Sequence, residues 1–178
     1  SRLSCQLIVG DELDGLIVKF WNVYGFESNL DKAHVITDFI LKALLTHEIS
    51  ILTDGQESRQ FLYADDCSRC LYTLSKQRKV VNRDHDLHVT NFQWTTIVEI
   101  AESVADIVGN TSVTRSETPD QVQGMRRNEP DTYILKHWRP TTELGDGIRT
   151  MVRIYSELLD DETFRKAAIL RLESLGGK

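Results

Sequence analysis

Apolar residues recur along this chain with the period of a strand and the period of a helix in turn. Residues 16–21 form a short apolar run typical of a buried strand, which enters a loop at Asn22. Over residues 34–47 the apolar side chains fall three and four apart, so one face of a helix is apolar. Residues 49–52 return to a strand, which ends at the turn dipeptide Asp54-Gly55. Strands that alternate with helices predict an α/β fold.

The same alternation continues through the rest of the sequence. The clearest helix start is the capping box of Thr96 and Glu99, in which each side chain can bond the other residue's backbone amide. Gly109 suits the left-handed position after that helix. We predict further strands at residues 59–63, 87–90 and 112–114, helices at 66–75, 95–108, 143–158 and after 160, and a polar loop over 115–140. These strands are too few and too short to close a sheet of their own.

Composition narrows the class of protein. The chain is 40% hydrophobic and 27% charged, as globular proteins are. Its net charge of −6 argues against a nucleic-acid partner, because phosphate binding needs a basic surface. No run approaches the roughly 18 apolar residues of a membrane span, and the start, Ser1-Arg2, shows no secretory signal. Three cysteines fit a reducing compartment better than a disulfide scaffold. We therefore expect a cytoplasmic protein without membrane contact.

Two motifs suggest metal or redox chemistry, but the sequence favours a plainer interpretation of each. Cys67 and Cys70 have the spacing of a redox or zinc motif, yet no second ligand pair lies at a suitable spacing. We expect both thiols to pack as small apolar side chains on one helix face. His85 and His88 lack the helical context of a zinc protease and are expected to be solvated in a loop. No metal site is predicted.

Acidic and basic residues leave several functional alternatives. Asp65 and Asp66 stand where carboxylates cap a helix, although acid–base chemistry is an alternative. Arg59 follows a polar turn and Arg126-Arg127 lies in the polar loop; each guanidinium suits a phosphate, and equally an ordinary surface cation. No GxGxxG, P-loop or GxSxG motif occurs, so we predict no dinucleotide cradle and no catalytic residue in this chain.

Several segments, taken in order, resemble a known family. Residues 49–66, Ile-Ser-Ile-Leu-Thr-Asp-Gly-Gln-Glu-Ser-Arg-Gln-Phe-Leu-Tyr-Ala-Asp-Asp, are similar to Ile-Thr-Ile-Tyr-Gly-Asp-Gly-x-Gln-Thr-Arg-Asp-Phe-Ile-Tyr-Val-Asp-Asp of the extended short-chain dehydrogenase/reductases. Residues 19–25, Lys-Phe-Trp-Asn-Val-Tyr-Gly, resemble Arg-Phe-Phe-Asn-Val-Tyr-Gly of the same proteins, the NAD-dependent nucleotide-sugar epimerases and dehydratases. Further similarities follow in the family's own order at residues 35–40, 95–101, 126–131 and 138–148.

The resemblance implies a domain order. In that family an N-terminal Rossmann domain binds NAD(P), and a smaller C-terminal domain closes over the nucleotide sugar. Residues 1–33 would then be the last part of the dinucleotide-binding domain, with the last strands of a Rossmann-type sheet, and residues 34–178 the smaller substrate-binding α/β domain. NAD or NADP would be bound mainly by sequence absent from this chain. The implied partners are a nucleotide sugar, a missing N-terminal half or partner chain, and a second copy in a homodimer.

The resemblance also implies roles at the motif positions. Asn22 would contact the substrate diphosphate near the nicotinamide, with Val23 against the cofactor, and Arg59 would hold the diphosphate. The other substrate-binding positions would be Ile51 and Thr53 near the base, His34 and Val35 at the entrance to its pocket, and Arg127 at a phosphate or ribose.

The chain departs from the family pattern where the chemistry is concerned. The family's Gly-rich loop and its Tyr-x-x-x-Lys pair do not occur in residues 1–18, ahead of the Asn-Val-Tyr segment, where the family's order would put them; Thr53 replaces a glycine, and Gln60 replaces an acid. Two functions therefore stay open. The chain is either the substrate-binding part of an NAD(P)-dependent epimerase or dehydratase, inactive alone, or a non-catalytic module that kept the fold. Epimerisation, dehydration, decarboxylation and reduction, and hence isomerase or lyase chemistry, all stay open.

Overall fold

Strands and helices alternate along the chain as the sequence predicts. The computed structural model describes residues 14–120 and 128–176. Its strands are β1 (Val18–Phe20), β2 (Asn22–Tyr24), β3 (Glu48–Ile51), β4 (Ser58–Arg59), β5 (Phe61–Tyr63), β6 (Leu87–Val89), β7 (Thr95–Thr96) and β8 (Ser112–Arg115). Its helices are η1 (Leu30–Lys32), α2 (Val35–Thr46), α3 (Ala64–Gln77), α4 (Ile97–Val108), η2 (Tyr133–Lys136), α5 (Leu144–Leu158) and α6 (Glu162–Gly176), where η marks a 3-10 turn. The predicted α/β class is confirmed.

Each strand pairs with a single neighbour within the described ranges. β1 pairs with β6, β2 with β5 and β3 with β8 in parallel, whereas β4 and β7 are antiparallel. A parallel pair requires a crossover connection, and helices supply it here. The expectation that these strands do not close a sheet of their own is confirmed. None of the helices that can be described combines the length and the apolar character needed to cross a membrane.

Two of the predicted strands are each divided in the structure. Residues 16–21 are not one buried strand entering a loop, because β1 is followed one residue later by β2. Phe20 in β1 is 54% exposed, so this strand is also less buried than predicted. Residues 59–63 divide in the same way into β4 and β5. At both places the chain changes its pairing partner, a change that the apolar period of one segment does not reveal.

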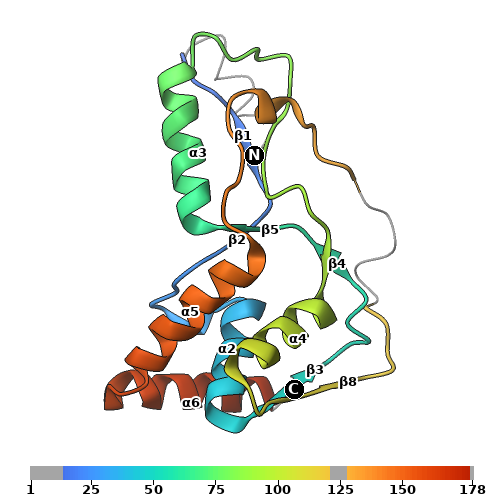
Figure 1. Cartoon of the computed structure of the whole chain (residues 1–178), viewed down its shortest axis with the longest axis vertical. Coiled ribbons are helices and arrows are strands. Elements are labelled where there is room, and N and C mark those ends of the chain that lie inside the picture. Colours follow the sequence, from blue (N-terminus) through green and yellow to red (C-terminus); the bar gives the residue numbers. More distant parts are fainter. Residues whose placement is uncertain (1–13, 121–127, 177–178) are drawn as a thin grey trace.

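Two apolar clusters form the core. The larger cluster gathers α2, α4, α5 and α6 at one end of the molecule, beside β3 and β8 (Figure 1). Ile40, Ile100 and Tyr155 are fully buried in it. The smaller cluster lies between α3, β6 and η2. β5 joins the two, since Phe61 belongs to the larger cluster and Leu62 to the smaller, as the opposite directions of successive strand side chains require.

The start of α4 is the local feature that the sequence predicts best. The Glu99 amide donates to Thr96 Oγ1 at 3.2 Å, and the Thr96 amide donates to Glu99 Oε2 at 2.7 Å. The predicted capping box is therefore confirmed. Gly109, at the other end, has the predicted positive φ of 77°, but its ψ of 161° lies outside the left-handed helical region. The glycine turns the chain directly toward β8 and does not extend the helix by a left-handed cap.

Asp65 and Asp66 do not cap α3, so that interpretation is wrong. The helix begins at Ala64, ahead of both carboxylates. Asp66 is fully buried and accepts hydrogen bonds from the backbone amides of Thr141 at 3.2 Å and Thr142 at 2.8 Å. Burial acts to raise the pKa of the Asp66 carboxyl, but these hydrogen bonds outweigh it and the pKa is lowered. The carboxylate joins α3 to the loop before α5, a contact that local sequence does not show.

The cysteines behave as predicted and one histidine does not. Cys67 and Cys70 are 8% and 0% exposed in the smaller cluster, and burial raises the pKa of Cys70 to about 12. The prediction that both thiols pack as small apolar side chains is confirmed. His85 is exposed and stacks on Tyr133 at 4.1 Å. His88 is not a solvated loop residue, because it lies within β6 and its side chain is only 15% exposed.

Candidate functional site

Two predicted site residues, Asn22 and Arg59, lie near the pairing of β2 with β5. Asn22 begins β2, and its Cα partner in β5 is Phe61. Arg59 stands two residues before Phe61 on the same stretch of chain. Asn22 is therefore the neighbour of a residue that follows Arg59 by two positions, and Arg59 itself lies in β4, which pairs with β7. The Asn22 side chain is exposed and Arg59 is half-buried.

The guanidinium of Arg59 is available to a ligand. Within residues 14–120 and 128–176, no hydrogen bond or ion pair engages it. The next residue, Gln60, is 1% exposed and accepts a hydrogen bond from the Thr90 hydroxyl at 2.9 Å. Since successive side chains of an extended chain point to opposite faces, Arg59 projects away from that buried pair. A guanidinium with free donors matches the geometry of an oxyanion.

The turn between β3 and β4 is fixed by the start of α4. The Gly55 carbonyl accepts a hydrogen bond from the Val98 amide at 3.1 Å, and the Glu57 carbonyl accepts one from the Ile97 amide at 3.0 Å. Gly55 has a φ of 72°, and a Cβ at this position would approach the Val98 Cβ to 3.1 Å. Glycine is required here both for its conformation and for the close approach. β4, which contains Arg59, therefore begins directly after a turn that is held in one conformation.

Thr53 and Glu57 contact each other across this turn. The Thr53 hydroxyl donates to Glu57 Oε1 at 2.8 Å and accepts a hydrogen bond from the Gly55 amide at 3.2 Å. The second carboxylate oxygen, Glu57 Oε2, is buried without a hydrogen-bond partner among the described residues. Thr53 and Glu57 both depart from the pattern of the similar family, and they contact each other. Sequence reasoning identified Thr53 and missed Glu57, although Glu57 stands where that pattern has glutamine.

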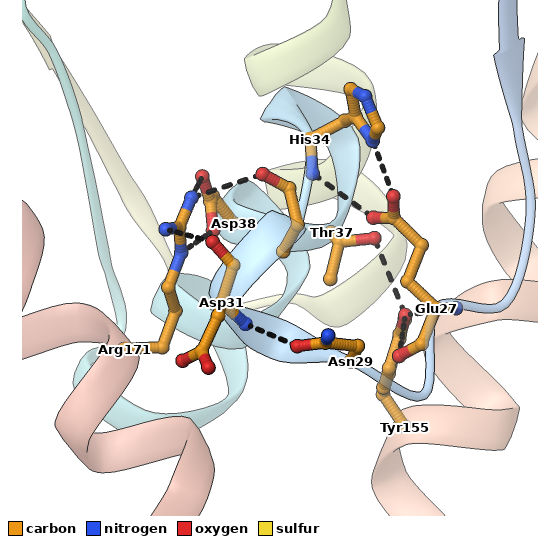
Figure 2. Close-up of polar contacts among 9 residues, drawn as sticks. Glu27, Asn29, Asp31, His34, Thr37, Asp38, Tyr155 and Arg171 are labelled. Atoms are coloured by element: carbon orange, nitrogen blue, oxygen red, sulfur yellow. Dashed lines mark hydrogen bonds and ion pairs between the residues drawn. The ribbon is translucent and has the colours of Figure 1, made fainter.

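Glu27 holds the beginning of α2, where two further predicted residues lie (Figure 2). Its Oε2 accepts a hydrogen bond from the His34 backbone amide at 3.0 Å, and its Oε1 contacts the His34 ring nitrogen Nδ1. His34 occupies the N-cap position, and its imidazole is 74% exposed. Val35 is the first residue of α2 and packs against the larger cluster from a partly buried position. Of the two, His34 presents its side chain at the surface.

The Glu27 carboxylate is stabilised in its ionised form. Burial acts to raise the pKa of this carboxyl, but hydrogen bonds from Thr37 and His34 outweigh burial and lower it. An anion at a helix N-terminus also interacts favourably with the helix dipole. Sequence reasoning missed Glu27 because it precedes His34 by seven residues in an irregular segment, where no periodic spacing relates the two.

The remaining predicted residues lie in different surroundings. Ile51 ends β3 and is 6% exposed, so its side chain faces the larger cluster. Val23, in the middle of β2, packs against the smaller cluster from a partly buried position. Arg126 and Arg127 lie outside the described residues.

A cavity of about 230 Å³ lies elsewhere, where the chain enters β1 and β6. It is lined by residues 15–17, Arg83 and residues 85–87, none of which was predicted as a site residue. In the part of the chain that the structure describes, no group of three or more His, Cys, Asp or Glu side chains is placed to hold a metal ion. Arg59, whose guanidinium has no partner among the described residues, and the exposed carboxamide of Asn22 are groups that bind an oxyanion and a hydroxyl or carbonyl.

Comparison with known proteins identifies similar sequences. The family model described as NAD dependent epimerase/dehydratase family matches residues 6–89, a stretch that contains Asn22, His34 and Arg59. Over that stretch the chain is similar to this family. The resemblance in the order of the sequence segments is therefore confirmed.

Among characterised relatives, the chain is similar to UDP-glucuronic acid decarboxylases. The chain is 26% identical over 141 residues to UDP-glucuronic acid decarboxylase 1 of Arabidopsis thaliana, which covers 76% of this chain and 31% of the relative. It is 23% identical over 148 residues to UDP-glucuronic acid decarboxylase 1 of Danio rerio, covering 82% of this chain and 34% of the relative. The chain thus spans about a third of the length of these relatives.

Solved structures share the fold. UDP-glucuronic acid 4-epimerase from Bacillus cereus, in complex with a fluorinated UDP-sugar and NAD, matches 88% of this chain over 50% of its own, with a TM-score of 0.71 and 20% identity. UDP-glucose 4-epimerase from Thermotoga maritima, in complex with UDP-glucose, matches 81% of this chain over 46% of its own length, with a TM-score of 0.67 and 21% identity. At this identity the likeness shows the fold, which is that of Rossmann-type epimerases and dehydratases over about half their length.

Proposed function

We propose that this chain is the substrate-binding part of an NAD-dependent enzyme that acts on a nucleotide sugar. Arg59 binds the substrate diphosphate, and Asn22 lies closer to the sugar. The base end of the site is formed by His34, Val35, Ile51 and Thr53, with Val23 toward the cofactor and Arg127 at a phosphate or ribose.

The observation that carries this proposal is the guanidinium of Arg59, which makes no hydrogen bond or ion pair with the described residues. A charge-assisted bond to an anion contributes roughly 1.5–3 kcal/mol, more than an exposed ion pair. Arg59 directly follows a turn whose Gly55 and Glu57 carbonyls accept hydrogen bonds from the first amides of α4. Such a turn lowers the conformational entropy lost on binding, so it suits recognition better than a mobile surface arginine does.

We propose a uridine diphosphate sugar as the substrate, with UDP-glucuronic acid the first candidate. The characterised relatives act on UDP-glucuronic acid, and two similar structures carry UDP-sugars. Decarboxylation, a lyase reaction, and epimerisation, an isomerase reaction, are the two reactions that these names support. In this proposal the diphosphate binds Arg59 while the sugar lies at Asn22. This placement orients the sugar ring toward a cofactor beyond Val23.

Two of the described glycines, Gly25 and Gly147, are not shaped to cradle a dinucleotide phosphate. Glycines that cradle phosphate leave room for the ligand, but a Cβ at Gly25 would meet Ala64 at 2.6 Å and one at Gly147 would meet Tyr24 at 1.9 Å. Protein atoms already fill these positions. We propose that NAD, rather than NADP, is bound mainly by sequence outside this chain, and that the chain alone turns over no nucleotide sugar.

We further propose that residues 1–33 belong with a dinucleotide-binding domain and residues 34–178 with the substrate domain. β1 and β2 pair with β6 and β5, so strands from the second part hold the end of the first. A missing half or a partner chain would supply the NAD-binding glycines, and the complete enzyme would be a cytoplasmic homodimer.

A nuclear magnetic resonance titration of the chain with UDP-glucuronic acid tests the substrate assignment. We expect shifts at the amides of Asn22, Arg59 and Thr53 and at the His34 ring, whereas free glucuronic acid should cause none of them. Shifts confined to other parts of the molecule would contradict the proposed site.

Calorimetry with NAD tests the division of labour between this chain and the rest of the enzyme. Because the sequence has no glycine fingerprint for a dinucleotide, and because protein atoms fill the space beside Gly25 and Gly147, we expect no binding of NAD at micromolar concentrations. Micromolar binding would contradict the assignment of the cofactor to other sequence. If the chain binds the nucleotide sugar but no turnover occurs after an NAD-binding partner is added, the alternative of a non-catalytic module is supported.

A further inference from the structure

Arg171, in the second half of α6, is bound at the beginning of α2. Its Nε donates to Asp38 Oδ1 at 2.9 Å and its Nη2 to Asp38 Oδ2 at 2.8 Å. The same guanidinium donates to the backbone carbonyls of Asp31 at 3.4 Å and Ala33 at 3.0 Å (Figure 2). The Arg171 and Asp38 side chains are only 16% and 13% exposed. A forked, largely desolvated pair of this kind is stronger than an exposed one.

The peptide unit that joins Ala33 to His34 is held at both of its polar ends. Its carbonyl accepts from Arg171, and its amide donates to Glu27 Oε2 at 3.0 Å. Glu27 is fixed in turn by Tyr155 of α5, whose hydroxyl accepts from the Glu27 amide at 3.0 Å. Figure 2 shows Arg171 and Glu27 on opposite flanks of this segment. Two C-terminal helices therefore set one peptide unit immediately before α2.

Apolar packing does little to hold α6 in register against α2. Within residues 162–175, Ala168 is the only fully buried side chain, and it is small. Phe164 and Leu172 pack on the larger cluster from partly buried positions, whereas Ile169 and Leu170 are 42% and 65% exposed. Hydrophobic contact is not directional. The polar fork of Arg171 is therefore the directional contact between α6 and the segment before α2.

We propose that Arg171 is a positioning residue for the base end of the nucleotide site. By holding the Ala33–His34 peptide, it sets the direction in which His34 and Val35 leave the backbone. This inference rests on the proposed function, which places those two residues beside the base. Arg171 itself does not contact the nucleotide. A lysine would keep the charge, but it cannot fork onto Asp38 and still reach two carbonyls.

Amide hydrogen exchange tests the positioning role directly, without a ligand. In Arg171→Gln we expect exchange to quicken roughly tenfold or more at the His34 and Asp38 amides, which donate to Glu27 and to the His34 carbonyl. The Ser112 amide, which donates to His47 at 3.0 Å in another part of the fold, should not change. Unchanged exchange at His34 would overturn the proposal, and so would equal acceleration at Ser112, because the change would then be global.

Affinity for UDP, measured on the same proteins, connects the peptide to the site. We expect Arg171→Gln to weaken UDP binding roughly tenfold, and Arg171→Lys to fall between this variant and the parent. Arg165→Gln is the matched control, since Arg165 is exposed on the same helix and its side chain makes no hydrogen bond or ion pair with another described residue. Faster exchange at His34 with UDP affinity unchanged would overturn the positioning role. A parent that binds no UDP would instead sink the proposed function and, with it, the nucleotide role of Arg171.

Discussion

Replacing Gly147 by alanine should destabilise the protein, although alanine is the better helix former. Gly147 lies near the start of α5. A Cβ at this position would come within 1.9 Å of the Tyr24 hydroxyl oxygen and 2.8 Å of the ring carbon that bears it. Tyr24 is 7% exposed in the larger cluster, and its hydroxyl donates to the Leu144 carbonyl at 3.3 Å. The ring cannot retreat without moving β2 or losing that bond.

Two opposing terms set the size of the effect. Overpacking a filled core costs about 1–3 kcal/mol. Alanine regains about 0.5–1 kcal/mol of helix propensity over glycine. The net loss of unfolding free energy is then about 1–2 kcal/mol, which corresponds to a fall of about 2–8 °C in Tm for a chain of this size.

Urea denaturation with Gly145→Ala as a matched control measures this effect. Gly145 lies on the same helix, and the atoms nearest to a Cβ there are the guanidinium nitrogens of exposed Arg149 at 3.8 Å. Gly145→Ala should therefore stabilise the protein by up to about 1 kcal/mol. Adding Tyr24→Phe to Gly147→Ala should recover part of the loss, because it removes the closest atom. A Gly147→Ala protein as stable as Gly145→Ala would refute the packing argument.

Three further outcomes follow from buried polar groups. Asp66→Ala leaves the amides of Thr141 and Thr142 without their acceptor, so the unfolding free energy should fall by roughly 1–3 kcal/mol in urea denaturation; no loss would contradict the bridging role. Burial raises the pKa of the Cys70 thiol to about 12, so it should react with iodoacetamide only after unfolding, and native-state labelling would contradict this. Burial lowers the pKa of His88 in the folded state, so the unfolded chain binds more protons below about pH 6.5 and Tm should fall as pH drops through that value; His88→Gln should remove this part of the decline, and an unchanged decline would assign it to other groups.

Contacts between residues close in sequence are the part of the fold that could be predicted. The alternation of apolar periods gave the helices and most strands, because burial of one face leaves a trace at fixed spacing. The capping box of Thr96 and Glu99 spans three residues, and the structure confirms both of its bonds. The CxxC pair was also predicted correctly, since Cys67 and Cys70 share a helix face with buried Leu74.

Long-range partners were beyond prediction from one sequence. Asp66 resembles a capping residue locally, but its carboxylate oxygens accept hydrogen bonds from backbone amides of a loop about 75 residues later in the chain. The division of residues 16–24 into β1 and β2 depends on which strand each one meets, not on the residues themselves. Arg171 and Asp38 lie 133 positions apart and had no signal in common. At the candidate site, Arg59 was identified from the polar turn before it and Asn22 through the family resemblance. Glu27 and Glu57, which hydrogen-bond to His34 and Thr53, were not identified.

Binding of UDP-glucuronic acid to Arg59→Lys and Arg165→Lys, each compared with the parent, tests the central assignment most directly. Both changes keep a positive charge, so the net charge and the long-range attraction of the substrate stay the same. If the forked guanidinium of Arg59 holds the diphosphate, its loss should weaken binding roughly tenfold to a hundredfold, while Arg165→Lys should bind as the parent does. Equal affinities for the two variants and the parent would show that Arg59 is an ordinary surface cation.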